Sequence, residues 1–121
     1  MISKESDIKG IQKLYATNEF NHFFAGLNEK TQMKFKQSFD IICTVYVLNT
    51  KLVKKLINTD LYEMRVSIGH NEYRTILFTI DNENIILSKN IVLLNGFLKK
   101  SKKDYERQIR KAEKIIKDSG L

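Results

Sequence analysis

Four lysines lie within five positions near the C-terminus of this 121-residue chain: Lys99, Lys100, Lys102 and Lys103. Such a group repels itself unless an anion binds to it, so the spacing indicates an anionic ligand. Crowded positive charge also favours the neutral form of a lysine, which can then accept a proton. We therefore interpret Lys99, Lys100 and Lys102 as candidates for proton transfer as well as for anion binding.

Two arginines upstream, Arg65 and Arg74, form a second group suited to an anion. A guanidinium keeps its charge and offers a planar fork of donors that matches a phosphate group. We therefore interpret both arginines as phosphate clamps and not as proton carriers. The alternative is that each arginine borders solvent or pairs with Glu63 or Glu72.

Other kinds of site lack the necessary residues. The chain has two histidines and one cysteine, and no spaced cluster of Cys, His and Asp, so we expect neither a metal site nor a pair of catalytic histidines. We expect His22 and Cys43 to be packed or surface residues, and we expect no cofactor.

Composition and charge indicate a single soluble domain, residues 1–121, with a polyanionic partner. With 42% hydrophobic and 29% charged residues the chain is neither disordered nor fibrous. Its apolar stretches are too short for a membrane span, and one cysteine with no signal-like N-terminus favours the cytoplasm. Nine basic against four acidic residues give residues 99–121 a net charge of +5 out of +7 for the whole chain, which favours nucleic acid or an acidic protein as partner.

The first half of the sequence predicts a short strand at Ile8–Tyr15 and then two helices. Asn18 and Asn28 are the expected N-caps. Apolar residues recur at helical spacing after each cap: Phe20, Phe23, Phe24 and Leu27, then Phe35, Phe39, Ile42 and Tyr46. We expect these helices to pair through their phenylalanines. The following stretch "TKLVKKLINTD" is interpreted as a link.

The period then changes to two, which predicts a hairpin of the strands "LYEMRVSI" and "EYRTILFTI". An even loop between them would place Arg65 and Arg74 on the same face of the sheet, and an odd loop on opposite faces. The best apolar pairing, Tyr62 with Phe78 and Met64 with Ile76, favours an odd turn at 69–71. "DNEN" predicts a second turn, after which "IIL" and "IVLL" form one interrupted strand or two short ones.

The last predicted element is a helix with two different faces. Apolar residues form one stripe, Tyr105, Ile109, Ala112 and Ile116, and the basic residues Lys103, Arg107, Arg110, Lys114 and Lys117 lie about 200° around the axis. The expected architecture is an α+β domain of order β-α-α-β-β-β-α, with an antiparallel sheet covered by the two N-terminal helices.

The segments "LYEMR", "EYRTILF" and "IVLLNGFLKKSKK", followed by the helix from Ile109 to Lys114, resemble the RelE/ParE superfamily of bacterial toxins, and most closely its HigB-like, phage-related branch. The resemblance covers about residues 56–118, and the two upstream helices take the place of the family's helical hairpin. It implies a RelE-like fold, a cognate antitoxin, expected to be a helix-turn-helix protein of the HigA type, and cleavage of mRNA, usually on the ribosome.

The resemblance also implies site residues. Arg65 and Arg74 match the basic positions of the central strands, and the lysines of "GFLKKSKK" match the basic loop. The remaining candidates, for substrate contact, are Lys103, Tyr105, Arg107 and His70. The end of the chain, "KDSGL", lacks the terminal His or Tyr of the family, and Tyr105, although it lies on the apolar stripe, is the nearest substitute.

Metal-free RNA cleavage needs an acceptor for the 2′-OH proton, positive charge for the phosphorane and a donor for the leaving 5′-oxygen. The basic residues above could supply the charge and a lysine the acceptor. Two other functions stay open. The first is a ParE-like inhibitor of DNA gyrase, whose relatives usually lack this basic set, and the second is a nucleic-acid-binding domain without catalysis.

Overall fold

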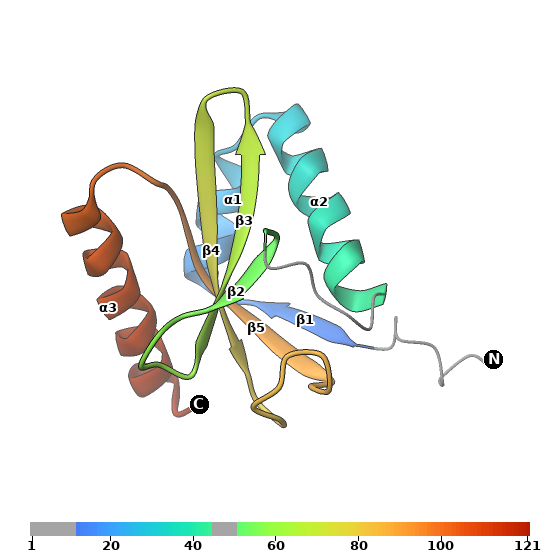
Figure 1. The fold of residues 1–121 in the computed structure, drawn as a ribbon, viewed down its shortest axis with the longest axis vertical. Coiled ribbons are helices and arrows are strands. Elements are labelled where there is room, and N and C mark those ends of the chain that lie inside the picture. Colours follow the sequence, from blue (N-terminus) through green and yellow to red (C-terminus); the bar gives the residue numbers. More distant parts are fainter. Residues whose placement is uncertain (1–11, 45–50) are drawn as a thin grey trace.

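The computed structural model describes residues 12–44 and 51–121 and has three layers (Figure 1). A five-stranded sheet forms the middle layer. The helices α1 (Asn18–Ala25) and α2 (Glu29–Thr44) lie against one face, and α3 (Lys102–Ser119) lies against the other. The predicted α+β class is therefore confirmed, with a helical pair before the main strands and a basic helix after them.

The sheet is mixed, and its strands are ordered β1-β5-β4-β3-β2. The strand bounds are β1 (Lys13–Ala16), β2 (Val53–Lys55), β3 (Leu61–Ile68), β4 (Asn71–Thr79) and β5 (Asn90–Leu98). All neighbours are antiparallel except β1, which is parallel to β5. This corrects the expectation of a purely antiparallel sheet. No hairpin connects β1 to β5, because the helices α1 and α2 and the strands β2, β3 and β4 lie between them in the sequence, so β1 can pair with β5 in the parallel direction.

Aromatic side chains fill the layer between the sheet and the first two helices, as predicted. The ring centroids of Phe20 and Phe39 are 5.9 Å apart, and Phe35 is fully buried. Phe23 lies directly on β5 at Gly96, where an added Cβ would come within 2.3 Å of the phenylalanine ring. Gly96 is therefore required by the close approach of α1 to the sheet.

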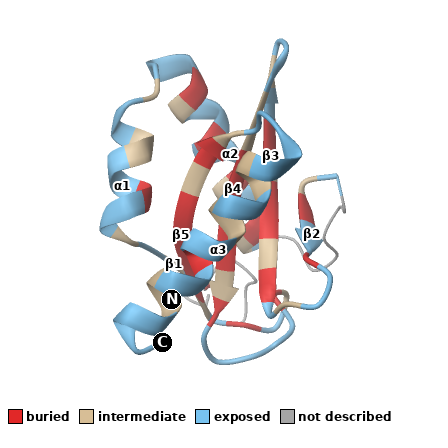
Figure 2. Cartoon of the chain, turned by 90° about the vertical axis from the view of Figure 1, so that its left-hand side faces the viewer, coloured by how far each residue is buried: buried red, intermediate tan, exposed pale blue. Residues whose placement is uncertain are grey.

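The opposite face of the sheet carries α3 through the predicted apolar stripe. Ala112 is fully buried, and Tyr105, Ile109 and Ile116 pack around it against the strands. In Figure 2 the helix lies in front of the sheet and its outer surface is exposed. That outer surface carries the predicted basic residues, all of them exposed: Lys103, Arg107, Arg110, Lys114 and Lys117.

Several element boundaries differ from the predictions. The N-cap of α1 is Thr17, whose hydroxyl accepts from the backbone N–H of Phe20 at 3.1 Å, and not Asn18; Asn28 accepts from Thr31 at 2.8 Å, as predicted. Of the predicted strand Ile8–Tyr15, residues 8–11 lie outside the described residues, as does Tyr46, and β1 extends to Ala16.

Two segments of the second half were also assigned wrongly. The stretch interpreted as a link contains β2, which pairs with β3 at the edge of the sheet. β2 has only three residues, two of which are lysines, so its sequence is too short and too polar to show the alternation that predicts a strand. "IIL" lies in turns organised by Asn84, whose side chain accepts from the N–H of Ile86 at 2.9 Å, so only the later run forms a strand.

The turn between β3 and β4 decides which residues share a face. It has two residues, Gly69 and His70, with Gly69 at φ 60°, and it pairs Arg65 with Arg74 and Met64 with Thr75. The inferred three-residue turn is therefore wrong. Because helices cover both faces of this sheet, apolar residues are needed on both, and matching them on one face does not fix the register.

Among the described residues, no helix is both long and apolar enough to cross a membrane.

Candidate active site

A buried carboxylate lies in the middle of the sheet on the face covered by α3. Glu63 on β3 is 2% exposed and lies opposite Ile76 of β4. The alternation of β3 places Glu63 and Arg65 on the same side, and the two-residue turn adds Arg74 to that side. A carboxylate in such a place requires partners that compensate its lost hydration.

Both arginines supply that compensation. Arg65 Nε donates to Glu63 Oε2 at 3.1 Å, and Arg74 Nε lies 3.5 Å from Glu63 Oε1. Arg74 is itself buried, and its Nη1 donates to Glu72 Oε1 at 3.3 Å. The side chain of Arg65 is 33% exposed and is the more accessible of the two arginines. The structure thus shows the arginines paired with Glu63 and Glu72, which was the alternative interpretation of their role.

Tyr105 of α3 completes the arrangement from the opposite layer. Its hydroxyl donates to Glu63 Oε1 at 2.5 Å, and its ring lies 6.0 Å from that of Phe97. Burial, the hydrogen bond to Glu63 and the negative charge of that carboxylate raise the pKa of Tyr105 above its usual value. The phenol therefore stays protonated at neutral pH and can act as a donor. Glu63, Arg65, Arg74 and Tyr105 are called the Glu63 cluster below.

Lys99 contacts the Glu63 cluster through the ring of Tyr105. Its Nζ lies 5.9 Å from the centroid of the Tyr105 ring, and its backbone N–H donates to the carbonyl of Glu72 at 2.7 Å. The Ser67 hydroxyl, with help from Arg74 and Lys99, holds the pKa of the Glu72 carboxyl below its usual value. Glu72 is thus an ionised group at the solvent side of the cluster.

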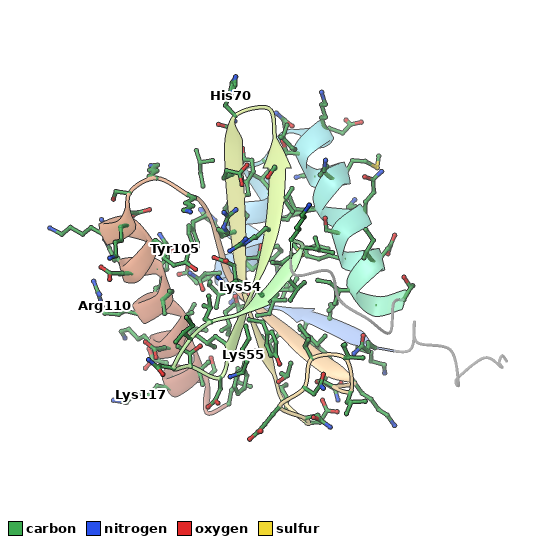
Figure 3. All side chains as sticks on the ribbon, in the orientation of Figure 1. Lys54, Lys55, His70, Tyr105, Arg110 and Lys117 are labelled. Atoms are coloured by element: carbon green, nitrogen blue, oxygen red, sulfur yellow. The ribbon has the colours of Figure 1, made fainter. Side chains whose placement is uncertain are left out.

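The other predicted site residues lie at a greater remove from Glu63. Lys100, Lys102 and Lys103 are exposed around the start of α3, and Arg107 pairs with Asp104 at 3.4 Å on its outer surface. His70 is at the exposed tip of the β3–β4 hairpin and points outward (Figure 3). Within the described residues, no side-chain hydrogen bond or ion pair joins these five residues to the Glu63 cluster.

One residue at this site was missed from the sequence, and another was considered only as a partner of the arginines. The sequence indicates Glu63 only as a possible partner of the arginines, because its role as the buried centre depends on Tyr105 of α3, 42 residues further along the chain. Lys54 lies directly opposite Glu63 in the β2–β3 ladder. The pair of lysines in the supposed link was the only local signal for it.

The arrangement combines groups for acid-base chemistry with groups that bind an anion. Two guanidinium groups directly opposite each other would repel, and the Glu63 carboxylate between them offsets that repulsion. The phenol and the carboxylate share one short hydrogen bond, so a proton donor and a proton acceptor lie side by side. No group of three or more His, Cys, Asp or Glu that could hold a metal ion occurs within residues 12–44 and 51–121.

Comparison with known proteins gave one family match. The family model described as "Phage derived protein Gp49-like (DUF891)" matches residues 22–117. This range runs from α1 into the last turn of α3 and includes the whole Glu63 cluster. No curated protein and no solved structure matched the chain.

Proposed function

We propose that this chain, which belongs to the Gp49-like family of phage-derived proteins, is a toxin that cleaves mRNA without a metal ion. The Gp49-like family is a family of RelE-like toxins in toxin–antitoxin systems. The observation that carries the proposal is the Glu63 cluster, in which one buried carboxylate contacts a phenol and two arginines. The HigB-like relationship and cleavage on the translating ribosome are parts of the same proposal.

In the proposed reaction the Glu63 carboxylate accepts the proton of a ribose 2′-OH. The 2′-oxygen attacks the adjacent phosphorus, the bond to the 5′-oxygen breaks, and the products are a 2′,3′-cyclic phosphate and a free 5′-OH. Arg65 and Arg74 stabilise the charge that develops on the phosphorane. Tyr105 is the candidate donor to the 5′-oxygen, because its raised pKa keeps the proton available.

The reaction requires the cluster to open. Glu63 is 2% exposed, and Tyr105 occupies one of its oxygens, so RNA reaches the carboxylate only after the hydrogen bond between them breaks. Of the two arginines, Arg65, at 33% exposure, is the one that a phosphate would meet first. An incoming phosphate then replaces Glu63 as the partner of the arginines and frees the carboxylate to act as a base.

The proposal includes an antitoxin as partner, expected to be a helix-turn-helix protein with acidic and apolar residues for the basic surface. Support comes from the family and from the unevenly spread charge. A tight complex without nuclease activity is expected on mixing. A partner that binds but leaves cleavage unchanged would contradict occlusion of the site.

In the first test the wild-type protein is expressed in a bacterium, where we expect toxicity and loss of mRNA. Glu63→Gln preserves the shape of the side chain but removes a basic oxygen, so we expect single-turnover cleavage of mRNA on stalled ribosomes to fall by roughly two to four orders of magnitude. Glu113→Gln, at an exposed position of α3, is the matched control and is expected to cleave normally.

Arg74→Ala is expected to restore growth, and because Arg74 is buried its unfolding must be measured alongside. Arg65→Ala, at the more exposed arginine, gives the same test with less effect on stability. If Glu63→Gln and Arg65→Ala, tested as single variants, both cleave mRNA at the wild-type rate, the assignment of this site is overturned. Toxicity without any loss of mRNA in the wild type would favour the gyrase-inhibitor hypothesis.

The role of the lysines as base stays a prediction that the same assay decides. Replacing Lys100 or Lys102 by Arg retains the charge but removes a group able to lose its proton near neutral pH. If one of them is the base, its variant binds mRNA and cleaves it 100-fold or more slowly. If Glu63 is the base, both variants cleave at close to the wild-type rate.

A further inference from the structure

A groove runs between the edge strand β2 and the first half of α3, beside the Glu63 cluster. Its volume is about 310 Å³, near the lower end of the range for ligand sites. Lys54 lines it from β2, Leu56 and Ile57 from the β2–β3 loop, and Lys102, Tyr105 and Ile109 from α3. Figure 3 shows Lys54 on the strand and Tyr105 on the helix.

The groove is continuous with the candidate active site through two residues. Tyr105 lines the groove and also donates its hydroxyl to Glu63. Lys54 is the ladder partner of Glu63, so the two side chains lie on the same face of the sheet in adjacent strands. A polymer bound at the Glu63 cluster would therefore extend into this groove.

Positive charge exceeds negative charge around the groove, because three lysines line it against one carboxylate, Glu106. Within the described residues no ion pair involves Lys54 or Lys102, whereas Lys111 and Lys114 of the same helix are each paired with a carboxylate. Lysines on an edge strand often prevent strand addition, which could explain Lys54 by itself. It does not explain Lys102, which comes from a different layer and faces the same groove.

An exposed apolar side chain lines the same groove as these cations. Ile57 is 81% exposed, and it is followed by Asn58 at φ 61°, a left-handed conformation that turns the chain sharply at this position. Leu56 and Ile109 provide further apolar wall. Alternation of cationic groups with an apolar surface suits a single nucleic-acid strand, whose phosphates contact the cations while a base covers the apolar side chain.

We propose that this groove binds the RNA strand next to the scissile phosphate, with Lys54 and Lys102 on backbone phosphates and one unstacked base against Ile57. The inference rests on the proposed nuclease function and extends it, since it assigns residues that determine where along the strand the Glu63 cluster acts.

The test measures binding separately from cleavage. A short single-stranded RNA with 2′-O-methyl riboses cannot be cleaved by attack of the 2′-oxygen, so its affinity is measured by fluorescence anisotropy, both free and on mRNA-programmed ribosomes. For free RNA, Lys54→Ala and Lys102→Ala are each expected to reduce the slope of log affinity against log salt by about 0.7, the value for one phosphate contact on a single strand. Lys36→Ala, at an exposed lysine of α2 on the other side of the sheet, is the matched control and should leave the slope unchanged.

A second measurement locates the base. Ile57→Ala should weaken binding of intact RNA several-fold, because it removes apolar surface that the base covers, and it should have no effect on RNA that is abasic at one particular position. Shifting that abasic position along the strand identifies the nucleotide in the groove. Equal effects of Ile57→Ala on every abasic RNA would overturn the placement of a base.

The outcomes distinguish this inference from the proposed function. If Glu63→Gln abolishes cleavage but the three groove variants bind and cleave like the wild type, the groove is refuted and the nuclease stands. If the groove variants lose RNA affinity but Glu63→Gln still cleaves, the groove stands and the catalytic assignment fails. Groove variants that weaken only the antitoxin complex would show that the occupant is protein, and no RNA binding by the wild type in either setting would also refute the inference.

Discussion

Replacement of Tyr105 by phenylalanine tests the hydrogen bond that connects α3 to the buried carboxylate. The change removes one hydroxyl that donates to Glu63 at 2.5 Å and leaves the ring contact with Phe97 in place. A hydrogen bond to a charged group contributes roughly 1.5–3 kcal/mol to stability. Because Glu63 keeps both arginines, we expect the low end, about 1.5 kcal/mol at pH 7, which corresponds to a Tm lower by about 6 °C for a domain of this size.

The assay is urea unfolding monitored by circular dichroism, with Tyr15→Phe as the control. Tyr15 also donates a hydrogen bond, to Asn90 Oδ1 at 3.1 Å, but it is 47% exposed, so its loss should cost less than about 0.5 kcal/mol. Equal midpoints for wild type and Tyr105→Phe at pH 7 would show that the bond to Glu63 does not form in solution.

The same variant predicts a pH dependence. The folded-state pKa of Tyr105 is raised, so its stabilising contribution is complete below the ordinary tyrosine value of about 10 and is lost as the pH rises above that value towards the folded-state pKa. The gap in stability between wild type and Tyr105→Phe should therefore narrow above about pH 10. A gap that widens there would refute the direction of the shift.

Three further substitutions test the scaffold. Gly96→Ala places a Cβ against the ring of Phe23 and should destabilise the protein by about 1–3 kcal/mol, measured by urea unfolding; an unchanged midpoint would contradict the close packing of α1 on β5. Asp81→Asn should flatten the acid side of the stability profile below about pH 4, because the backbone N–H of Lys89, with other donors, lowers the pKa of Asp81 to about 2 and its contribution is lost as the pH falls through that range. Ser101→Ala removes the N-cap of α3 and should cost about 1 kcal/mol in thermal unfolding, whereas Ser101→Asp should not.

Elements with strong periodicity could be predicted from the sequence. The stripe that ends in Ala112 and Ile116 identified α3 and its buried face, because a helix that packs on one side repeats its apolar residues every three to four positions. The hairpin strands were equally clear. β2 could not be predicted, because three residues with two exposed lysines satisfy no pattern and become a strand only through pairing with β3.

The sequence indicated Arg65, Arg74 and Tyr105 as site candidates and Glu63 as a possible partner of the arginines, but not that Glu63 joins all three. Glu63 looks like any polar residue of an alternating strand, and its burial comes from a helix that follows two strands later. Whether the two arginines share a face of the sheet depends on whether the turn has two residues or three. The pairing of apolar residues cannot decide between these lengths when helices cover both faces of the sheet.

The parallel pairing of β1 with β5 has a consequence for the order of folding. The hydroxyl of Thr17, directly after β1, donates to the carbonyl of Leu94 on β5, 77 residues further along the chain, whereas β3 and β4 are joined by a turn of two residues. Closing the longer loop loses more chain entropy, so the hairpin should form early and β1 should join last. Until then the backbone edge of β5 is open to other chains, and aggregation during folding is expected to be most sensitive to substitutions in Lys13–Ala16.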